Sequence, residues 1–390
     1  MPAAGSHDDL QANLVQLRRD LHSHPELGYE ESRTAALVAS KLQALGIEVT
    51  TGLGKTGVVG TLRRGDSPRS VGLRADMDAL PLTELNEFPH RSRHEGRMHA
   101  CGHDGHTAML LGAAEALSAS RDFSGTVHFI FQPAEESGGG ARAMIEDGLL
   151  ERFPMQQVFA LHNWPGLAVG ELHVRDGVMM AGADTFEIHV TGRGGHAAMP
   201  HQAIDVIVAS SSLVQALQTL VSRNVDAQQA AVVSVTRFNA GQTTNVLPER
   251  AELAGTVRTF TPEMQSALES GMHRICHGIE EAFGVTIRLD YRHGYPPTRN
   301  ASGPVELCRN VAREVFGAER VRGDLMPSMG SEDFAFIAQA VPACYAWIGN
   351  GMIGDGAHLH SPHYDFNDDL IPFGVRYWVR LTRAALAESS

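Results

Sequence analysis

The sequence predicts an α/β protein with a mixed sheet, in which the α/β domain is split by an inserted ferredoxin-like α+β domain. Two observations predict this fold class. Short apolar runs alternate with helical segments in the first and last parts of the chain, as buried strands between helices do. The middle of the chain instead follows the order βαββαβ. We expect the split domain at residues 1–183 and 298–390, and the insertion at 184–297.

The first part of the chain opens with two amphipathic helices. Apolar residues recur at helical spacing over 8–22 and 30–45, and Gly46 ends the second helix as a C-terminal glycine does. A third helix is expected at about 107–118. The strands are compact apolar runs at 57–62, 71–75, 127–131 and 158–161.

The inserted part has its own periodicity. Long helices are expected at 203–221 and 262–283, between strands at 185–190, 231–238, 251–259 and 285–291. After Pro296 and Pro297 the chain returns to helix. It then forms an apolar strand at 344–348 and a final helix at 370–386. The last elements therefore complete the split domain.

Composition excludes several classes of protein. The 390 residues are 43% hydrophobic and 20% charged, which excludes a disordered or fibrous chain. Lys+Arg 32 against Asp+Glu 45 gives a net charge of −13, so nucleic acid and anionic membranes are repelled on average. The start MPAAGSHDDL is unlike a secretory signal, and no run of about 18 apolar residues exists to span a membrane. These features predict a cytoplasmic protein.

Polar clusters stand where the predicted strands give way to loops. Two aspartates follow the strand at 71–75, and a Cys-x-His stretch precedes the helix at 107–118. Two adjacent glutamates follow 127–131, one histidine follows 158–161, and three histidines lie near the C-terminus. These residues are Asp76, Asp78, Cys101, His103, His106, Glu135, Glu136, His162, His358, His360 and His363. Taken singly, each is better explained as a turn, cap or packing residue.

Their joint occurrence points to metal. Thiolate, imidazole and carboxylate are the donors expected for Zn²⁺ or another late first-row divalent ion. One ion could not use them all, but two ions sharing a bridging ligand would use Cys101, His103, Glu136, His162 and one C-terminal histidine. Adjacent Glu135 and Glu136 would repel each other, so one is expected to bind cation. The other is then free to act as general base and acid.

The motifs also form a known series. LRADMDALP, MHACGHDGHT, FQPAEE, LHNWP, GGHAAMP, NVLP, GTVRT, MGSEDF and HSP occur in this order in the M20D amidohydrolases, which the chain resembles from about His24 to Leu370. That group includes hippurate hydrolases, bacterial N-acyl-amino-acid amidohydrolases and plant auxin-conjugate hydrolases. The resemblance implies a catalytic domain with two divalent ions (Zn, or Mn, Co or Ni), an inserted lid and a homodimer or higher oligomer.

The resemblance also implies roles for single residues. It marks Cys101, His103, Glu136, His162 and His360 as metal ligands, Glu135 as the base and Asp78 as a residue that orients a ligand or the base. His360 is preferred to His358 and His363 because it stands in the His-Ser-Pro motif; chemistry alone does not separate the three. In the lid, His196 would stabilise the oxyanion in its own or a partner's site, and Asn245 and Arg258 would hold the substrate.

The sequence departs from the wider M20 peptidases at two places. These usually have His-x-Asp where this chain has Asp76-Met77-Asp78, and a bridging Asp where it has Cys-x-His. The identity of the metals is therefore left open. Glu332 and Asp333 in MGSEDF are expected to begin and cap a helix, and a role beside the metals stays open for them.

The implied function is metal-dependent hydrolysis of N-acyl amino acids, hippurate-like or N-acetylated, to a carboxylic acid and a free amino acid. Two alternatives stay open: a dipeptidase or carboxypeptidase of the same family, and a catalytically silent metal-binding protein. A two-metal phosphatase is disfavoured by the net charge of −13 and by the few basic residues near the clusters.

Overall fold

A computed structural model describes residues 7–136, 138–353 and 358–387. The chain divides into two compact units. The first unit comprises Met1–Met179, Thr298–Met326 and Asp333–Ser390, and the second comprises Met180–Pro297 and Pro327–Glu332. Within the described ranges, no helix combines the length and apolar character needed to cross a bilayer.

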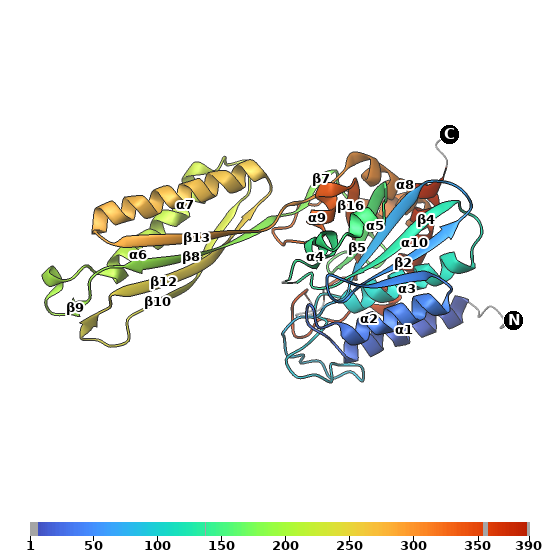
Figure 1. Ribbon diagram of the computed structural model, residues 1–390, viewed down its shortest axis with the longest axis horizontal. Helices are drawn as coiled ribbons and strands as arrows, with labels where there is room; N and C mark the ends of the chain where they lie inside the picture. The colour runs from blue at the N-terminus through green and yellow to red at the C-terminus, as the bar shows by residue number, and fades with distance from the viewer. Residues whose placement is uncertain (1–6, 137, 354–357, 388–390) are drawn as a thin grey trace. The chain divides into compact units, whose positions relative to one another are not determined.

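The first unit is built on a mixed eight-stranded sheet in the order β1-β2-β4-β3-β5-β16-β6-β15. Figure 1 labels β2, β4, β5 and β16 of this sheet. Its four central strands, β4, β3, β5 and β16, run parallel, so their carboxyl ends meet at one edge. The strands are β1 Glu48–Leu53, β2 Gly57–Arg64, β3 Ser70–Asp76, β4 Gly125–Gln132, β5 Gln157–Trp164, β6 Leu172–His173, β15 Val321–Arg322 and β16 Ala343–Gly349. The predicted mixed α/β sheet is confirmed.

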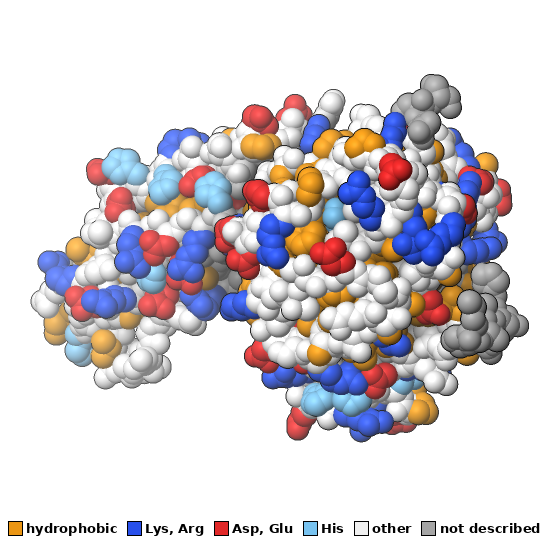
Figure 2. Space-filling view, turned by 45° about the vertical axis from the view of Figure 1, so that its right-hand side comes forward, with side chains coloured by type: hydrophobic (Ala, Val, Ile, Leu, Met, Phe, Trp, Pro, Cys, Tyr) orange, Lys and Arg blue, Asp and Glu red, His pale blue; other side chains and the backbone are white. Residues whose placement is uncertain are grey.

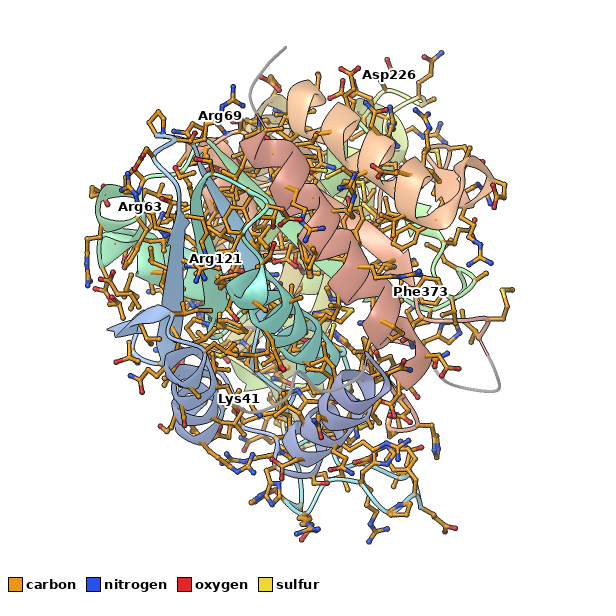
Figure 3. The ribbon with its side chains drawn as sticks, turned by 90° about the vertical axis from the view of Figure 1, so that its right-hand side faces the viewer. Lys41, Arg63, Arg69, Arg121, Asp226 and Phe373 are labelled. Atoms are coloured by element: carbon orange, nitrogen blue, oxygen red, sulfur yellow. The ribbon has the colours of Figure 1, made fainter. Side chains whose placement is uncertain are left out.

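Helices cover this sheet and share one continuous apolar cluster with it. The helices in the cluster are α1 His7–Ser23, α2 Ser32–Ala44, α3 His103–Ala119, α8 Ser302–Phe316 and α10 Ile371–Leu386. Shorter helices are α4 Gly140–Glu146, α5 Leu149–Arg152 and α9 Ala335–Ala340. Figure 3 shows Lys41 of α2 and Arg63 of β2 directed outward from the packed elements, where both are exposed.

The second unit contains a four-stranded antiparallel sheet in the order β10-β12-β8-β13. Helices α6 and α7 pack on its apolar face, which is the ferredoxin-like arrangement. The elements are β8 Gly182–Thr191, β9 Gly195–His196, α6 Val206–Thr219, β10 Val232–Ala240, β11 Val246–Leu247, β12 Arg250–Thr259, α7 Pro262–Phe283 and β13 Thr286–Tyr295. Two further short strands, β7 Gly177–Met180 and β14 Thr298–Asn300, pair with each other and belong to the first unit, except for Met180.

Charged side chains are mixed in sign on the surface. On the face drawn in Figure 2, basic and acidic side chains lie next to each other over each unit. On the second unit, some of them pair across or along strands, as Arg288 Nη2 and Asp290 Oδ2 do at 2.9 Å. Such exposed pairs contribute little to stability, roughly 0 to 1 kcal/mol each.

Some details differ from the expectation. Helix α3 begins at His103 and not at about Thr107, because Gly102 turns the chain in the left-handed conformation and the first helical turn is polar, which hides it from an apolar pattern. Strand β1 was missed because most of its residues are exposed or half-buried. Asp333 does not cap α9, whose N-cap Phe334 makes no side-chain cap bond. Its carboxylate instead accepts hydrogen bonds from Gln132 and Ala141.

Candidate metal centre

The polar clusters of the first unit meet beyond the carboxyl ends of β3, β4 and β5. Ligand atoms of Cys101, Glu136 and His360 lie within 4.8 Å of one another, and so do those of His103, Glu135 and Glu136. Glu136 belongs to both groups and therefore lies between them.

Single distances link the remaining members. His360 Nε2 lies 3.4 Å from Glu136 Oε1, and His103 Nε2 lies 3.8 Å from the same oxygen. Cys101 Sγ lies 3.4 Å from His162 Nε2. The structure thus brings together all five residues predicted as ligands. All three C-terminal histidines are exposed, but His358 and His363 belong to none of the close groups found among the described residues.

Two buried atoms in this cluster have no hydrogen-bond partner among the described residues. They are His103 Nε2 and Glu136 Oε1. A buried polar atom without a partner costs about 1 to 3 kcal/mol, and such atoms are rare in folded proteins. Both atoms are of types that bind divalent metal, so the donor set fits a cation between them.

The ligand rings are held by their other nitrogens. His103 Nδ1 lies 2.9 Å from the carbonyl oxygen of Asp78 and 3.1 Å from its Oδ1, and His162 Nδ1 lies 2.7 Å from the carbonyl oxygen of Asn163. A proton on Nδ1 satisfies each contact and leaves Nε2 as a lone-pair donor. Asp78 Oδ2 also accepts the N–H of Glu136 at 3.0 Å. Asp78 therefore orients one ligand ring and the backbone of another.

The electrostatics show an excess of negative charge. Burial, together with Glu136 and Glu135, raises the pKa of the Cys101 thiol well above its usual range. Burial would lower the pKa of His103, yet Asp76, Asp78 and Glu136 raise it to about 10. Without a cation the site therefore holds protons that a dication would replace.

Asp76 and His106 lie close to His103 and His162, but their ligand atoms already have hydrogen-bond partners. His106 Nδ1 lies 2.6 Å from Asp76 Oδ1, and His106 Nε2 accepts the N–H of Asn163 at 2.9 Å. Asp76 Oδ2 accepts from Arg74 Nη1 at 2.7 Å. Asp76 and His106 thus bind each other and neighbouring groups beside His103 and His162, and their ligand atoms lie within 4.8 Å of those of the two histidines.

Asn163 and Tyr364 were missed by the sequence reasoning. Asn163 Nδ2 donates to the carbonyl oxygen of Cys101 at 2.6 Å, and Tyr364 donates its hydroxyl to Asn163 Oδ1 at 2.7 Å. Gly102 has φ +94°, and a Cβ there would lie 2.2 Å from Asn163 Nδ2. The one signal in the sequence was that Asn163 directly follows a candidate ligand, His162.

Glu135 is buried, and its Oε1 accepts the N–H of Asp333 at 3.4 Å. The side chain of Asp333 is held in turn by Gln132 Nε2 at 2.7 Å and by the N–H of Ala141 at 2.9 Å. Glu135 thus lies beside the ligands in a packed, polar environment.

The three predicted lid residues lie in the second unit. His196 is exposed, and its Nδ1 accepts the N–H of Ala198 at 3.1 Å, so a neutral ring carries its hydrogen on Nε2 and can donate. Asn245 is also exposed, and its Oδ1 accepts from the Thr243 hydroxyl at 3.0 Å. Arg258 is half-buried; burial lowers its pKa, against the attraction of Asp184.

Comparison with known proteins gives consistent results. The family model for peptidase family M20/M25/M40 matches residues 72–384. The chain is 44% identical to a hippurate hydrolase of Campylobacter jejuni, over 96% of each chain. It is 39% identical to an N-acetyl-L-cysteine deacetylase of Bacillus subtilis, over 93% of this chain and 85% of that protein. A Bacillus subtilis crystal structure described as a dinuclear metal binding peptidase of the M20 family matches with a TM-score of 0.84 and 33% identity, over 97% of this chain and 99% of that chain.

Proposed function

This chain belongs to peptidase family M20/M25/M40 and is a metal-dependent amidohydrolase, and we propose that Glu135 is the proton carrier with which it hydrolyses N-acyl amino acids. The observation that carries the proposal is the position of Glu135. One of its carboxylate oxygens lies within 4.8 Å of donor atoms of His103 and Glu136, two of the proposed ligands, and Glu135 is not itself one of the five residues proposed as ligands.

The proposed ligands are Cys101, His103, Glu136, His162 and His360. When two divalent ions are bound, they polarise a carbonyl group and lower the pKa of water. Zinc suits the thiolate of Cys101, and manganese, cobalt or nickel could use the same donors. The four cysteines are free, which suits a reducing, cytoplasmic setting.

The chain's own part in the reaction is proton transfer and binding. Glu135 takes a proton from water as the water oxygen bonds to the amide carbon. The C–N bond then breaks, and Glu135 gives the proton to the departing nitrogen, so that the products are a carboxylic acid and a free amino acid. His196 Nε2 and Asn245 are the proposed donors to the oxyanion. Arg258 is the proposed partner of the substrate carboxylate, because a guanidinium pairs with it through two parallel hydrogen bonds.

A substrate panel tests this proposal. The metal-loaded protein should hydrolyse hippurate and N-acetylated amino acids, and kcat/KM should fall by roughly tenfold or more when the substrate carboxylate is replaced by an amide, because a hydrogen bond to a charged group contributes about 1.5 to 3 kcal/mol. Rates are measured by release of the free amino acid. Dipeptides cleaved faster than every acyl amino acid would establish a dipeptidase, and no turnover on any compound would leave a silent metal-binding protein.

The second unit is the proposed dimerisation surface. Helix α6, Val206–Thr219, contains no charged residue, and its Ile207 and Val208 are 38% and 52% exposed. Ile207 lies beside Gly241, the residue that directly follows β10. Strand β10 is at the edge of its sheet, and its Phe238 is 41% exposed. An uncharged helix face beside an edge strand suits contact with a second copy of the chain, because a dimer would bury both surfaces.

Charge on this face should separate the copies. Val208→Asp should convert a dimer to monomers in analytical ultracentrifugation, because the new carboxylate would be buried without a partner. Ala267→Asp, on the exposed side of α7, is the matched control and should leave the mass unchanged. If wild type is monomeric, or if both variants stay dimeric, the proposed surface is wrong.

A further inference from the structure

The turn that carries Glu135 is strained. Ala134, directly before Glu135, has φ +50°, a left-handed conformation that residues other than glycine rarely adopt. Of the four described residues other than glycine with positive φ, two more lie around the same place: Tyr29 and Lys55. The Lys55 ammonium lies 4.4 Å from the centroid of the Tyr29 ring, and Tyr29 donates its hydroxyl to the carbonyl oxygen of Gly138 at 2.7 Å. Such strain persists only where surrounding contacts hold it.

Glu31 provides the contact that holds Ala134. Its side chain is fully buried, although it lies about a hundred residues before the turn in the sequence. Glu31 Oε1 accepts the N–H of Ala134 at 2.8 Å, and Oε2 accepts the hydroxyl of Thr56 at 2.6 Å. Neither Glu31 nor Thr56 belongs to the close groups of metal-ligating residues found in the described part of the chain.

Hydrogen bonds also hold the residues of the turn that follow the N–H of Ala134. The carbonyl oxygen of Ala134 accepts the N–H of Gly138 at 3.2 Å and of Gly140 at 3.1 Å. The N–H of Glu136 donates to Asp78 Oδ2 at 3.0 Å. Glu135 thus stands between two backbone N–H groups, each bound to a buried carboxylate. Asp78 belongs to the metal centre, whereas Glu31 does not.

We propose that Glu31 is a positioning residue for Glu135. Its carboxylate binds the N–H of Ala134 and keeps that residue left-handed, and this backbone conformation directs the Glu135 side chain toward the ligands. Without the acceptor, Ala134 relaxes toward an ordinary negative φ and displaces the carboxylate that follows it. This inference rests on the proposed role of Glu135 as proton carrier.

The test compares four variants of the full-length, metal-loaded chain with hippurate as substrate. Glu31→Ala should lower kcat by about 100-fold with KM little changed, since a displacement of about 1 Å at a catalytic group costs that much. Glu31→Gln should stay within about fivefold of wild type, because an amide oxygen still accepts the N–H of Ala134. Thr56→Val, the matched control, removes the other hydrogen bond of Glu31 and should lower the melting temperature while kcat stays.

A second substitution tests whether the loss in Glu31→Ala comes from the backbone conformation of Ala134. Ala134→Gly in the Glu31→Ala background should restore at least tenfold in kcat, because glycine adopts positive φ without steric cost. Metal content by elemental analysis should stay that of wild type in every variant. If Glu31→Ala gives too little folded protein, Glu31→Asp, one methylene shorter, takes its place with the same expected loss and rescue.

Three results would overturn the inference. They are wild-type kcat in Glu31→Ala despite a lower melting temperature, equal losses in Glu31→Ala and Glu31→Gln, and no rescue by Ala134→Gly. Glu135→Gln is measured in parallel. If Glu135→Gln keeps its turnover, the proposed function itself fails; if it is inactive while Glu31→Ala is fully active, only the role of Glu31 fails.

Discussion

Glu135→Gln should lower kcat for hippurate by roughly 10³-fold or more, within the range of 10² to 10⁴ that a general acid and base contributes. Glutamine keeps the shape of the side chain and still accepts the N–H of Asp333, but it cannot take a proton from water or give one to the departing nitrogen. The loss should appear in kcat and not in KM, because binding does not require the proton. Progress curves of amino acid release at saturating substrate measure it.

Glu135→Gln should leave the fold and the metal content unchanged. Glu136, and not Glu135, is the proposed ligand, so elemental analysis of Glu135→Gln should match wild type. Glu146→Gln, at an exposed position on α4, is the control for loss of one acidic charge and should keep full activity. Near-normal turnover in Glu135→Gln would remove Glu135 from the mechanism, and loss of metal in that variant would show that it is a ligand.

Parallel topology explains why much of this site could be predicted from the sequence. Residues that follow parallel strands meet at one edge, so Glu136 after β4 and His162 at the end of β5 were expected near each other. Apolar runs such as β4 mark these strands clearly because they are buried on both faces. Strand topology could not predict which C-terminal histidine joins them. His358, His360 and His363 have the same chemistry and differ only in where the loop places them.

The supporting contacts could not be predicted. Asn163 holds Cys101 from 62 positions along the chain, and Glu31 holds Ala134 from 103 positions along it. A hydrogen bond of this kind depends on tertiary packing and leaves no periodic pattern. The capping prediction for Asp333 was wrong for the same reason, because a polar residue before a short helix suggests a cap unless its distant partner, such as Gln132, is known. The alternative left open for it, a place beside the metal centre, agrees with its position next to Glu135.

Removal of metal should have the largest effect of all. A chelator should abolish turnover, and addition of a divalent ion should restore it. The protein should also lose stability, because ions bind the folded chain at preformed donors. At a free metal concentration a thousand times the dissociation constant, binding adds about 4 kcal/mol to the free energy of unfolding, or roughly 5 °C in melting temperature.

The metal-free site explains the size of this loss. Among the described residues, it leaves the buried His103 Nε2 and Glu136 Oε1 without a hydrogen-bond partner, and it leaves protons to balance the carboxylates around Cys101 and His103. Cys101→Ser should therefore reduce both the metal content and the difference in melting temperature between metal-loaded and chelated protein. Cys276→Ser, at another buried thiol in the second unit, is the matched control. It should preserve that difference even if it lowers both melting temperatures, because Cys276 is in none of the close groups of metal-ligating residues among those described. A preparation that is active while elemental analysis finds no metal would contradict the assignment of this cluster as the catalytic centre.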